Sequence, residues 1–543
     1  MSVLNGLTRD HPAWGFLYLV LFAVTFFYDS QAGFPYAAWD WGVPVNEVGF
    51  KNIIATSISY TINHGLFAFE LPIYFVQYFL WICFGEYFVI VLSLGIFSFG
   101  YCGYFWFLKS KIGDPHFAAV CSGVITFGPF AASQFIAGHL PFLVSLSAIP
   151  WVLLVSRRPS IVKGTLALIA LMALVFATPH GFVFILVVTV GLYAIKTVTL
   201  GQVFRVSTAA LSLMVLSVAI AGGANIKQTH QDSQITVDNS AFSVSLINGV
   251  TQNPITLVDL FGGLRSSSMF DEYVVPENPL KRTVTLFYTA AVGSFFFIFL
   301  LINRCRLGLV LVCSVLGLGY FISIVSRVPW LLNYPDIFGA VSHPARLLIP
   351  LWVVQSTAAF KLLSRTEFST PIVSKLTLVT TLAAVFSWAP LWTSSGEVDA
   401  NQPLVVVVGS DPEYSDLARH IRPGSTTVIF PNAAFYEVGR DRGMAPWQER
   451  YLNFESAQTR VNLRFDQVMC SASTQDMLRF VDDVPFRYLL FSTADVRKRY
   501  VGGCELLEGT SGRLDLDAAE VLFSKLGFTV LYVSERYLLL EAR

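Results

Sequence analysis

Charged residues are scarce in this chain. Only 13% of its 543 residues are Asp, Glu, Lys or Arg, whereas 54% are hydrophobic and 15% are aromatic. A soluble globule of this composition would have too little polar surface to cover its apolar residues. The composition therefore excludes an ordinary soluble protein and predicts a polytopic membrane protein. The 36 basic and 36 acidic residues leave no net charge, which argues against a nucleic-acid partner.

Motifs for metals and dinucleotides are also missing. The sequence has no CxxC or HExxH spacing, so its motifs indicate no metal site. Five of the seven cysteines lie in or beside apolar runs, where Cys acts as a small core residue. The other two, Cys470 and Cys504, lie in the polar C-terminal part, where an oxidising exterior would permit a disulfide between them. The sequence does not give the distance between the two residues, so it does not decide whether the disulfide forms.

The few charges are unevenly distributed, and this divides the chain in two. Of the 72 charged residues, 37 fall in the last 150 positions, 394–543. We therefore predict a transmembrane domain over 1–393 and a soluble domain over 394–543, with the boundary near the polar run 393–402. Alternating strand and helix patterns follow that boundary, so the soluble domain is expected to be α/β. No GxGxxG follows its first strand, which leaves a dinucleotide site unsupported.

Apolar runs separated by polar loops predict about eleven spans in the first domain. The first, 13–28, reads as a retained anchor because no small-residue cleavage site follows it. The block 71–108 is too long for one crossing and is broken at Gly85-Glu86, so 71–84 is expected to be a surface or re-entrant helix. The later spans are expected at 87–108, 117–134, 140–156, 165–178, 182–195, 207–221, 284–302, 307–325, 347–363 and 376–392.

The loop charges predict the orientation of these spans. In this arrangement the basic residues of the short loops share one side, which marks the cytoplasm and places the N-terminus inside. They are Arg9, Lys109, Lys111, Arg157, Arg158, Lys163, Lys196, Arg205, Arg304, Arg306, Lys361, Arg365 and Lys375. An odd number of spans then places the C-terminal domain, the first outer loop 29–70 and the long loop 222–283 outside the plasma (inner) membrane.

The first outer loop carries two acids, Asp29 and Asp40, among aromatic residues, Gly and Pro. An acid held beside apolar neighbours at a membrane surface is costly unless it is solvated or used. Further polar residues near span ends on the same side suggest an outer cavity; these are His64, Glu70, His139 and His180. The alternative is a solvated loop, with histidines that are only interfacial or hydrogen-bonded.

Two further stretches on the outer side could bind a phosphate. In Ser342-His343-Pro344-Ala345-Arg346, the proline fits the first turn of the next span and would place His343 and Arg346 at a helix start, where anions bind. Arg346 could equally anchor the span at the headgroup level. The long loop has apolar patches that suggest it lies back on the membrane domain, bringing Arg265 to the same mouth.

The layout resembles the GT-C superfamily of integral membrane glycosyltransferases, and most closely YfhO-like membrane proteins. The resemblance is carried by AAWDWGVP after the first span, GYFWFLK, GHLPFLVSLSAIPW, SHPAR, and the closing KLGFTVLYVSERYLLLE. It implies transfer of a hexose or pentose from a polyprenyl-phosphate donor to a glycan, lipid or protein acceptor on the outer face, with inversion. Asp40 would be the general base, with Asp29 as the other candidate.

The same resemblance implies roles for the cations, since Arg346, with His343 or Arg265, would hold the lipid phosphate as it leaves. No acidic pair such as Asp-Glu or Asp-x-Asp follows the first span. The sequence therefore does not decide which acid is the base or whether Mg or Mn binds. Two other classes also fit: a non-catalytic membrane subunit with an outer docking domain, and a transporter that handles lipid or glycan. A transporter would favour charges at mid-span and internal repeats, and neither stands out in this sequence.

Overall fold

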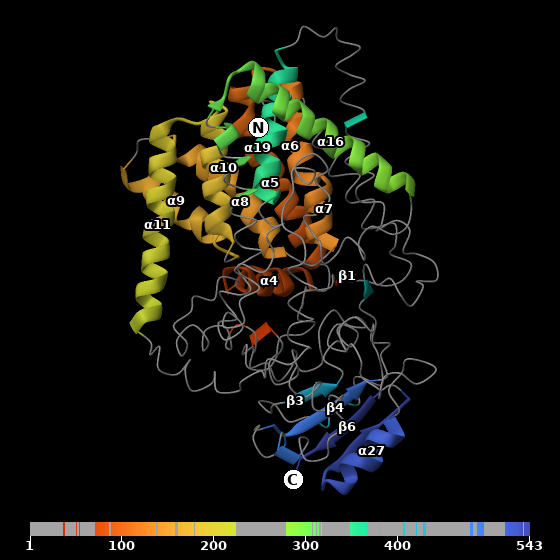
Figure 1. Ribbon diagram of the computed structural model, residues 1–543. Helices are drawn as coiled ribbons and strands as arrows, with labels where there is room; N and C mark the ends of the chain where they lie inside the picture. Colours follow the sequence, from red (N-terminus) through yellow and green to blue (C-terminus); the bar gives the residue numbers. More distant parts are fainter. Residues whose placement is uncertain are drawn as a thin grey trace.

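The computed structural model of the chain comprises a helical bundle and a smaller β-rich part (Figure 1). It describes residues 36–37, 50–51, 54, 71–85, 88–136, 140–157, 161–178, 180–223, 279–306, 348–365, 427–430, 486–492, 516–535 and 537–542, with single residues and short pieces within 308–317, 379–380, 406–420 and 478–481.

The bundle helices overlap the apolar runs of the sequence, but the run 117–134, expected as one span, is divided into two helices at Gly128, where α6 ends. They are α4 (Leu71–Phe84), α5 (Phe88–Ile112), α6 (Pro115–Phe127), α7 (Pro129–Ile136), α8 (Leu140–Val155), α9 (Ile161–Val175), α10 (Gly181–Ala194), α11 (Leu200–Gly223), α16 (Pro279–Ile302) and α19 (Leu348–Leu363). By length and composition, one helix in the described part of the chain could cross a membrane, over Ile90–Ile112, and several shorter apolar helices accompany it. The expected first span lies outside the described residues.

Hydrogen bonds between helix ends show that five helices finish together. The Ser364 hydroxyl donates to the Ile112 carbonyl at 2.9 Å, which joins the ends of α19 and α5. Arg157, just after α8, donates to the Ser110 hydroxyl at 3.0 Å. Arg365 donates to the Asn303 side-chain oxygen at 2.9 Å, just after α16. Lys361 Nζ of α19 donates to the Ile195 carbonyl at 3.0 Å, just after α10. We call this end of the bundle the basic end.

Small residues let α5 and α8 approach closely. A Cβ atom at Gly100 would lie 2.6 Å from the Ser147 hydroxyl, and one at Gly103 would lie 2.5 Å from Trp151 Nε1. The same contact is fixed by polar groups, since the Trp151 indole donates to the Phe99 carbonyl at 2.9 Å. Such close packing of small residues is how helices associate where water supplies no driving force.

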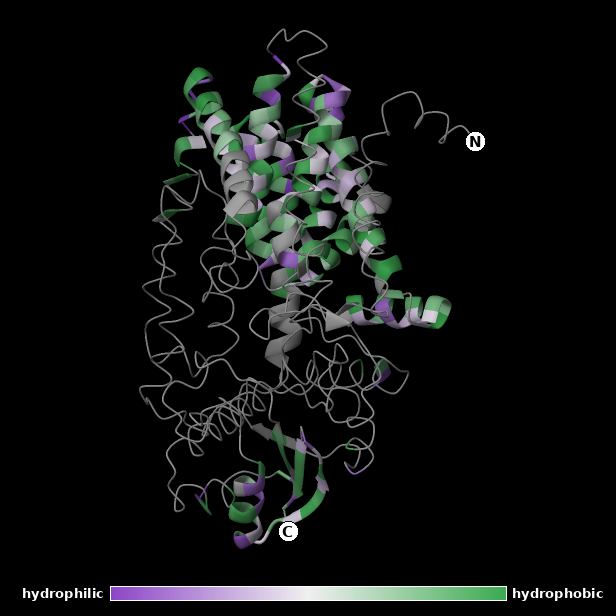
Figure 2. Cartoon of the chain, turned by 90° about the vertical axis from the view of Figure 1, so that its right-hand side faces the viewer, coloured by the Kyte–Doolittle hydropathy of each residue, from purple (hydrophilic) through white to green (hydrophobic). Residues whose placement is uncertain are grey.

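Helix α4 lies across the bundle rather than along it (Figures 1 and 2). Its 14 residues span roughly 21 Å, which is short of the roughly 30 Å hydrocarbon core. Gly85 ends it with φ +57°, a left-handed conformation that favours glycine. Phe50 holds it against α5, because its ring lies 5.6 Å from Tyr78 and 5.5 Å from Phe88. The helix at 71–84 is thus short and transverse to the bundle, and its placement at a membrane surface stays a prediction.

The β-rich part is a four-stranded sheet at the opposite side of the bundle from the basic end (Figure 1). The strands β3 (Thr427–Phe430), β4 (Tyr488–Ser492), β5 (Thr529–Val533) and β6 (Tyr537–Glu541) run in the order β3-β4-β6-β5. β3 and β4 are parallel and the other pairs are antiparallel. Helix α27 (Leu516–Lys525) covers the sheet, with Phe523 5.1 Å from Phe491. Strands and a helix thus occur in the part of the chain where the alternating pattern predicts both; the domain boundary at 393 stays a prediction.

A second, two-stranded sheet joins the first outer loop to the C-terminal part. Strand β1 (Tyr36–Ala37) pairs antiparallel with β2 (Val406–Val407). The first lies between Asp29 and Asp40 in sequence, and the second falls in the β-branched run that follows the predicted domain boundary. The structure therefore connects two parts of the chain that the sequence pattern treats as separate.

Candidate functional site

Several residues of the predicted site lie in the sequence just before the start of a bundle helix. Because α5, α8, α10 and α19 finish at the basic end, they all begin at the other end, near α4 and the sheet (Figure 1). His139 directly precedes α8, His180 precedes α10, and Arg346 lies two residues before α19. The elements flanking the predicted residues thus meet at one end of the bundle, which we call the site end.

His180 is the one member of the predicted set within the described residues. It is half-buried at the start of α10, and its Nδ1 atom lies 3.3 Å from the Thr178 hydroxyl. Its ring packs 5.1 Å from Phe142 and 6.2 Å from Phe184. The side chain makes no capping hydrogen bond to α10; its contacts include the Thr178 hydroxyl and two aromatic rings. Its place in an outer cavity stays a prediction.

The remaining predicted residues lie outside the described residues. They are Asp29, Asp40, His64, Glu70, His139, Arg265, His343 and Arg346, together with Cys470 and Cys504 of the predicted disulfide. Their roles stay predictions. No group of three or more His, Cys, Asp or Glu that could hold a metal occurs in the described ranges, which exclude the acids of the first outer loop.

Helix α19 is firmly held at the site end. Trp352 is fully buried, and its indole nitrogen donates to the Val124 carbonyl at 3.3 Å. Its ring lies 5.3 Å from that of Phe130. Gly128 leaves the space for this indole, since a Cβ there would lie 3.3 Å from Trp352 Nε1 and only 2.1 Å from the Val124 oxygen. Helix α19, which begins two residues after Arg346 in the sequence, therefore has a fixed position against α6 and α7.

Two buried polar groups near the site end were not found from the sequence. Gln77 lies inside the apolar helix α4, and its Oε1 atom has no hydrogen-bond partner among the described residues. Ser93, in the second turn of α5, is also buried, and its Oγ atom has no hydrogen-bond partner among the described residues. A buried polar atom without a partner costs free energy, so each could bond a ligand or water. The sequence signal was a single glutamine in a run of apolar and aromatic residues.

Comparisons with known proteins give distant similarities of fold. No protein-family model and no curated protein matches the chain. ArnT from Cupriavidus metallidurans, in a crystal structure bound to undecaprenyl phosphate, is 11% identical, with a TM-score of 0.46 and 98% of each chain covered. The oligosaccharyltransferase of Archaeoglobus fulgidus in the apo form is 11% identical, with a TM-score of 0.43 and coverage of 88% of this chain and 69% of that chain.

The archaeal oligosaccharyltransferase AglB, in complex with an inhibitory peptide and a dolichol-phosphate, is also similar. It is 11% identical, with a TM-score of 0.41, covering 93% of this chain and 72% of that chain. At 11% identity and TM-scores below 0.5, the likeness concerns overall layout and gives no residue of this chain a role.

Proposed function

We propose that the chain is a membrane glycosyltransferase that moves a sugar from a polyprenyl-phosphate-linked donor to an acceptor on the outer face of the membrane. The observation that supports this most is the site end: the helices that follow His139, His180 and Arg346 begin together, opposite the basic end. Cations mark the cytoplasmic side of membrane proteins, so the site end would face outward. The inner-membrane location and the outer position of the C-terminal domain belong to the same proposal.

The chemistry requires one base and one anion site. Asp40 takes the proton of the acceptor hydroxyl as its oxygen attacks the anomeric carbon, and the bond from that carbon to the phosphate oxygen breaks with inversion. Polyprenyl phosphate leaves with the bonding electrons. Arg346 holds its developing charge, with His343 or Arg265 beside it. Asp29 is the second candidate for the base, and Mg or Mn would bind through these same acids.

The β1–β2 pair supports a role for the C-terminal domain in this reaction. Its two backbone pairs attach the Asp29–Asp40 segment to the start of that domain. A loop tied at its middle has fewer conformations, so less entropy is lost when its acid is positioned for proton transfer. The C-terminal domain would then orient the base, and the acceptor would enter between the two parts.

Donor turnover in membranes tests the proposal. Membranes carrying the wild type, Asp40→Asn, Asp29→Asn or the control Asp517→Asn on α27 are supplied with radiolabelled polyprenyl-phosphate hexoses and pentoses, with expression matched. Loss of a general base lowers the rate by about 10²- to 10⁴-fold, so Asp40→Asn should lose transfer while Asp517→Asn keeps it. If no donor is consumed and both loop variants still complement a deletion strain, the chain is a non-catalytic subunit instead.

A further inference from the structure

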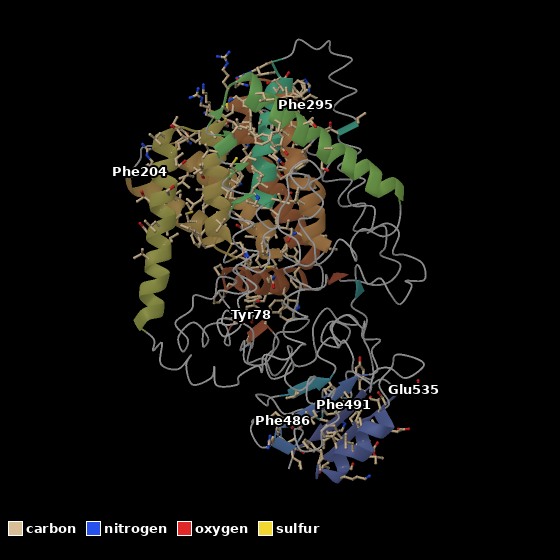
Figure 3. The ribbon with its side chains drawn as sticks, viewed as in Figure 1. Tyr78, Phe204, Phe295, Phe486, Phe491 and Glu535 are labelled. Carbon is tan, nitrogen blue, oxygen red and sulfur yellow. The ribbon has the colours of Figure 1, made fainter. Side chains whose placement is uncertain are left out.

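The basic end carries five cations in electrostatic contact, here called the basic cluster: Lys111, Arg157, Lys196, Lys361 and Arg365. They come from the ends of α5, α8, α10 and α19. Lys361 lies within the electrostatic reach of Arg365, Lys111 and Lys196, and Lys111 lies within that of Arg157. Figure 3 shows nitrogen-bearing side chains at this end of the bundle, on the side away from the sheet. Like charges therefore gather where five helices end.

No carboxylate neutralises this cluster within the described residues. None of its five members forms an ion pair there. Asp114, between α5 and α6, uses its Oδ1 atom to accept from the backbone nitrogens of His116 and Phe117 at 2.7 and 3.3 Å, which caps α6. Like charges repel unless a counter-charge is bound. The positive charge of the cluster is therefore not balanced by a carboxylate among the described residues.

Helix dipoles account for only part of the positive charge. Lys361 Nζ donates to the carbonyls of Ile195 and Lys196 at 3.0 and 3.1 Å, so it compensates the C-terminus of α10. A helix end carries about half an elementary charge, which is less than the full charge of each cation beside it. The Arg157 Nε atom is also buried without a partner among the described residues, although both terminal nitrogens of that side chain are bonded. The helix ends therefore leave part of the positive charge of the cluster uncompensated.

Apolar surface lies beside the basic cluster at the same end. Leu200 and Phe204 in the first turns of α11 are 63% and 71% exposed, and Leu301 and Ile302 in the last turn of α16 are 68% and 64% exposed. A free phosphate would use only the cations. A ligand with an anionic head and hydrocarbon chains would use both surfaces.

We infer that the basic cluster binds the phosphate headgroup of an anionic phospholipid from the leaflet at the basic end. Basic sites between helices on the cytoplasmic side are suited to such headgroups. Lys361 and Arg157 hold the helix ends in place, whereas Lys111 and Lys196 make no side-chain hydrogen bond among the described residues and are free to contact the phosphate. The inference is independent of the proposed transferase activity.

A two-residue variant tests this binding with little risk to folding. Lys111→Gln with Lys196→Asn removes two charges, and Asn tolerates the left-handed backbone of residue 196, where φ is 56°. The control is Lys525→Gln with Arg479→Gln, which removes two charges from the C-terminal part. A second control, Lys111→Arg with Lys196→Arg, keeps the charge of the cluster.

Each purified full-length protein is titrated with phosphatidylglycerol or phosphatidylcholine, and bound lipid is counted by native mass spectrometry. Wild type and both controls should prefer phosphatidylglycerol, and the charge-removing variant should bind it roughly 30-fold less tightly. Equal retention by that variant would overturn the inference. Displacement of the lipid by millimolar glycerol phosphate would show a soluble-phosphate site instead. If the double variant does not fold, Lys111→Gln alone should lose roughly fivefold.

Discussion

Tyr36 lies opposite Val407 in the antiparallel β1–β2 pair, which joins the loop of the candidate base to the start of the C-terminal part. If this pair positions the loop, then breaking it should reduce transfer without unfolding the bundle. Val406→Pro removes a backbone donor and fixes φ, both of which disrupt a strand. Val406→Thr keeps the backbone and serves as the control.

We expect Val406→Pro to lower kcat for sugar transfer while detergent-solubilised protein keeps its helical circular dichroism. Limited proteolysis should cut the first outer loop sooner in the proline variant than in the threonine control. Unchanged kcat with faster cleavage would mean that the pair only protects the loop. Unchanged cleavage would mean that the two strands do not hold the loop at all.

The contact between α5 and α8 predicts a packing defect at one glycine and not at another. A Cβ at Gly103 would lie 2.5 Å from Trp151 Nε1 and 2.8 Å from Pro150 Cγ, whereas Gly95 of the same helix has nothing within 4 Å. Overpacking costs about 1–3 kcal/mol, so Gly103→Ala should lower the thermal midpoint. Gly95→Ala should leave it unchanged or raise it, because alanine favours the helix by about 1 kcal/mol. Equal midpoints would show that the helices can separate freely.

The buried Trp352 predicts a link between packing and donor binding. Trp352→Phe keeps the ring contact with Phe130 but leaves the Val124 carbonyl without its 3.3 Å indole donor. An unsatisfied buried group costs about 1–3 kcal/mol, and the start of α19 should shift with Arg346 before it. We expect a lower thermal midpoint and a raised KM for the lipid-linked donor. Trp106→Phe, at an exposed position of α5, should change neither.

The positions of the helices and strands were largely predictable from the sequence because they depend on local patterns. The break at Gly85 follows from the length of its apolar run, and strands occur in the C-terminal part, where the alternating pattern predicts them. The grouping of loop cations also follows from counting apolar runs, since each crossing reverses the direction of the chain. Arg157, Lys361 and Arg365 meet at one end for this reason.

Contacts between distant residues were not predictable in the same way. The pairing of Tyr36 with Val407, the indole bond from Trp352 to Val124 and the approach of Gly103 to Trp151 depend on how helices and loops meet in space. No periodicity in one segment encodes its partner in another. The contact of His180 with Phe142 was unpredictable for the same reason, because Phe142 lies on another helix, α8.

The packing of His180 predicts that its ring shape matters more than its proton. His180→Phe keeps an aromatic ring between Phe142 and Phe184 and loses the 3.3 Å contact to Thr178. We expect transfer to stay within a few-fold of wild type and the thermal midpoint to hold. His180→Ala removes the ring that packs against both Phe rings, so it should lower the midpoint, by less than the loss of a fully buried ring would. Proton transfer contributes about 10²- to 10⁴-fold, so a loss of that size in His180→Phe, with the midpoint unchanged, would make His180 an acid or base.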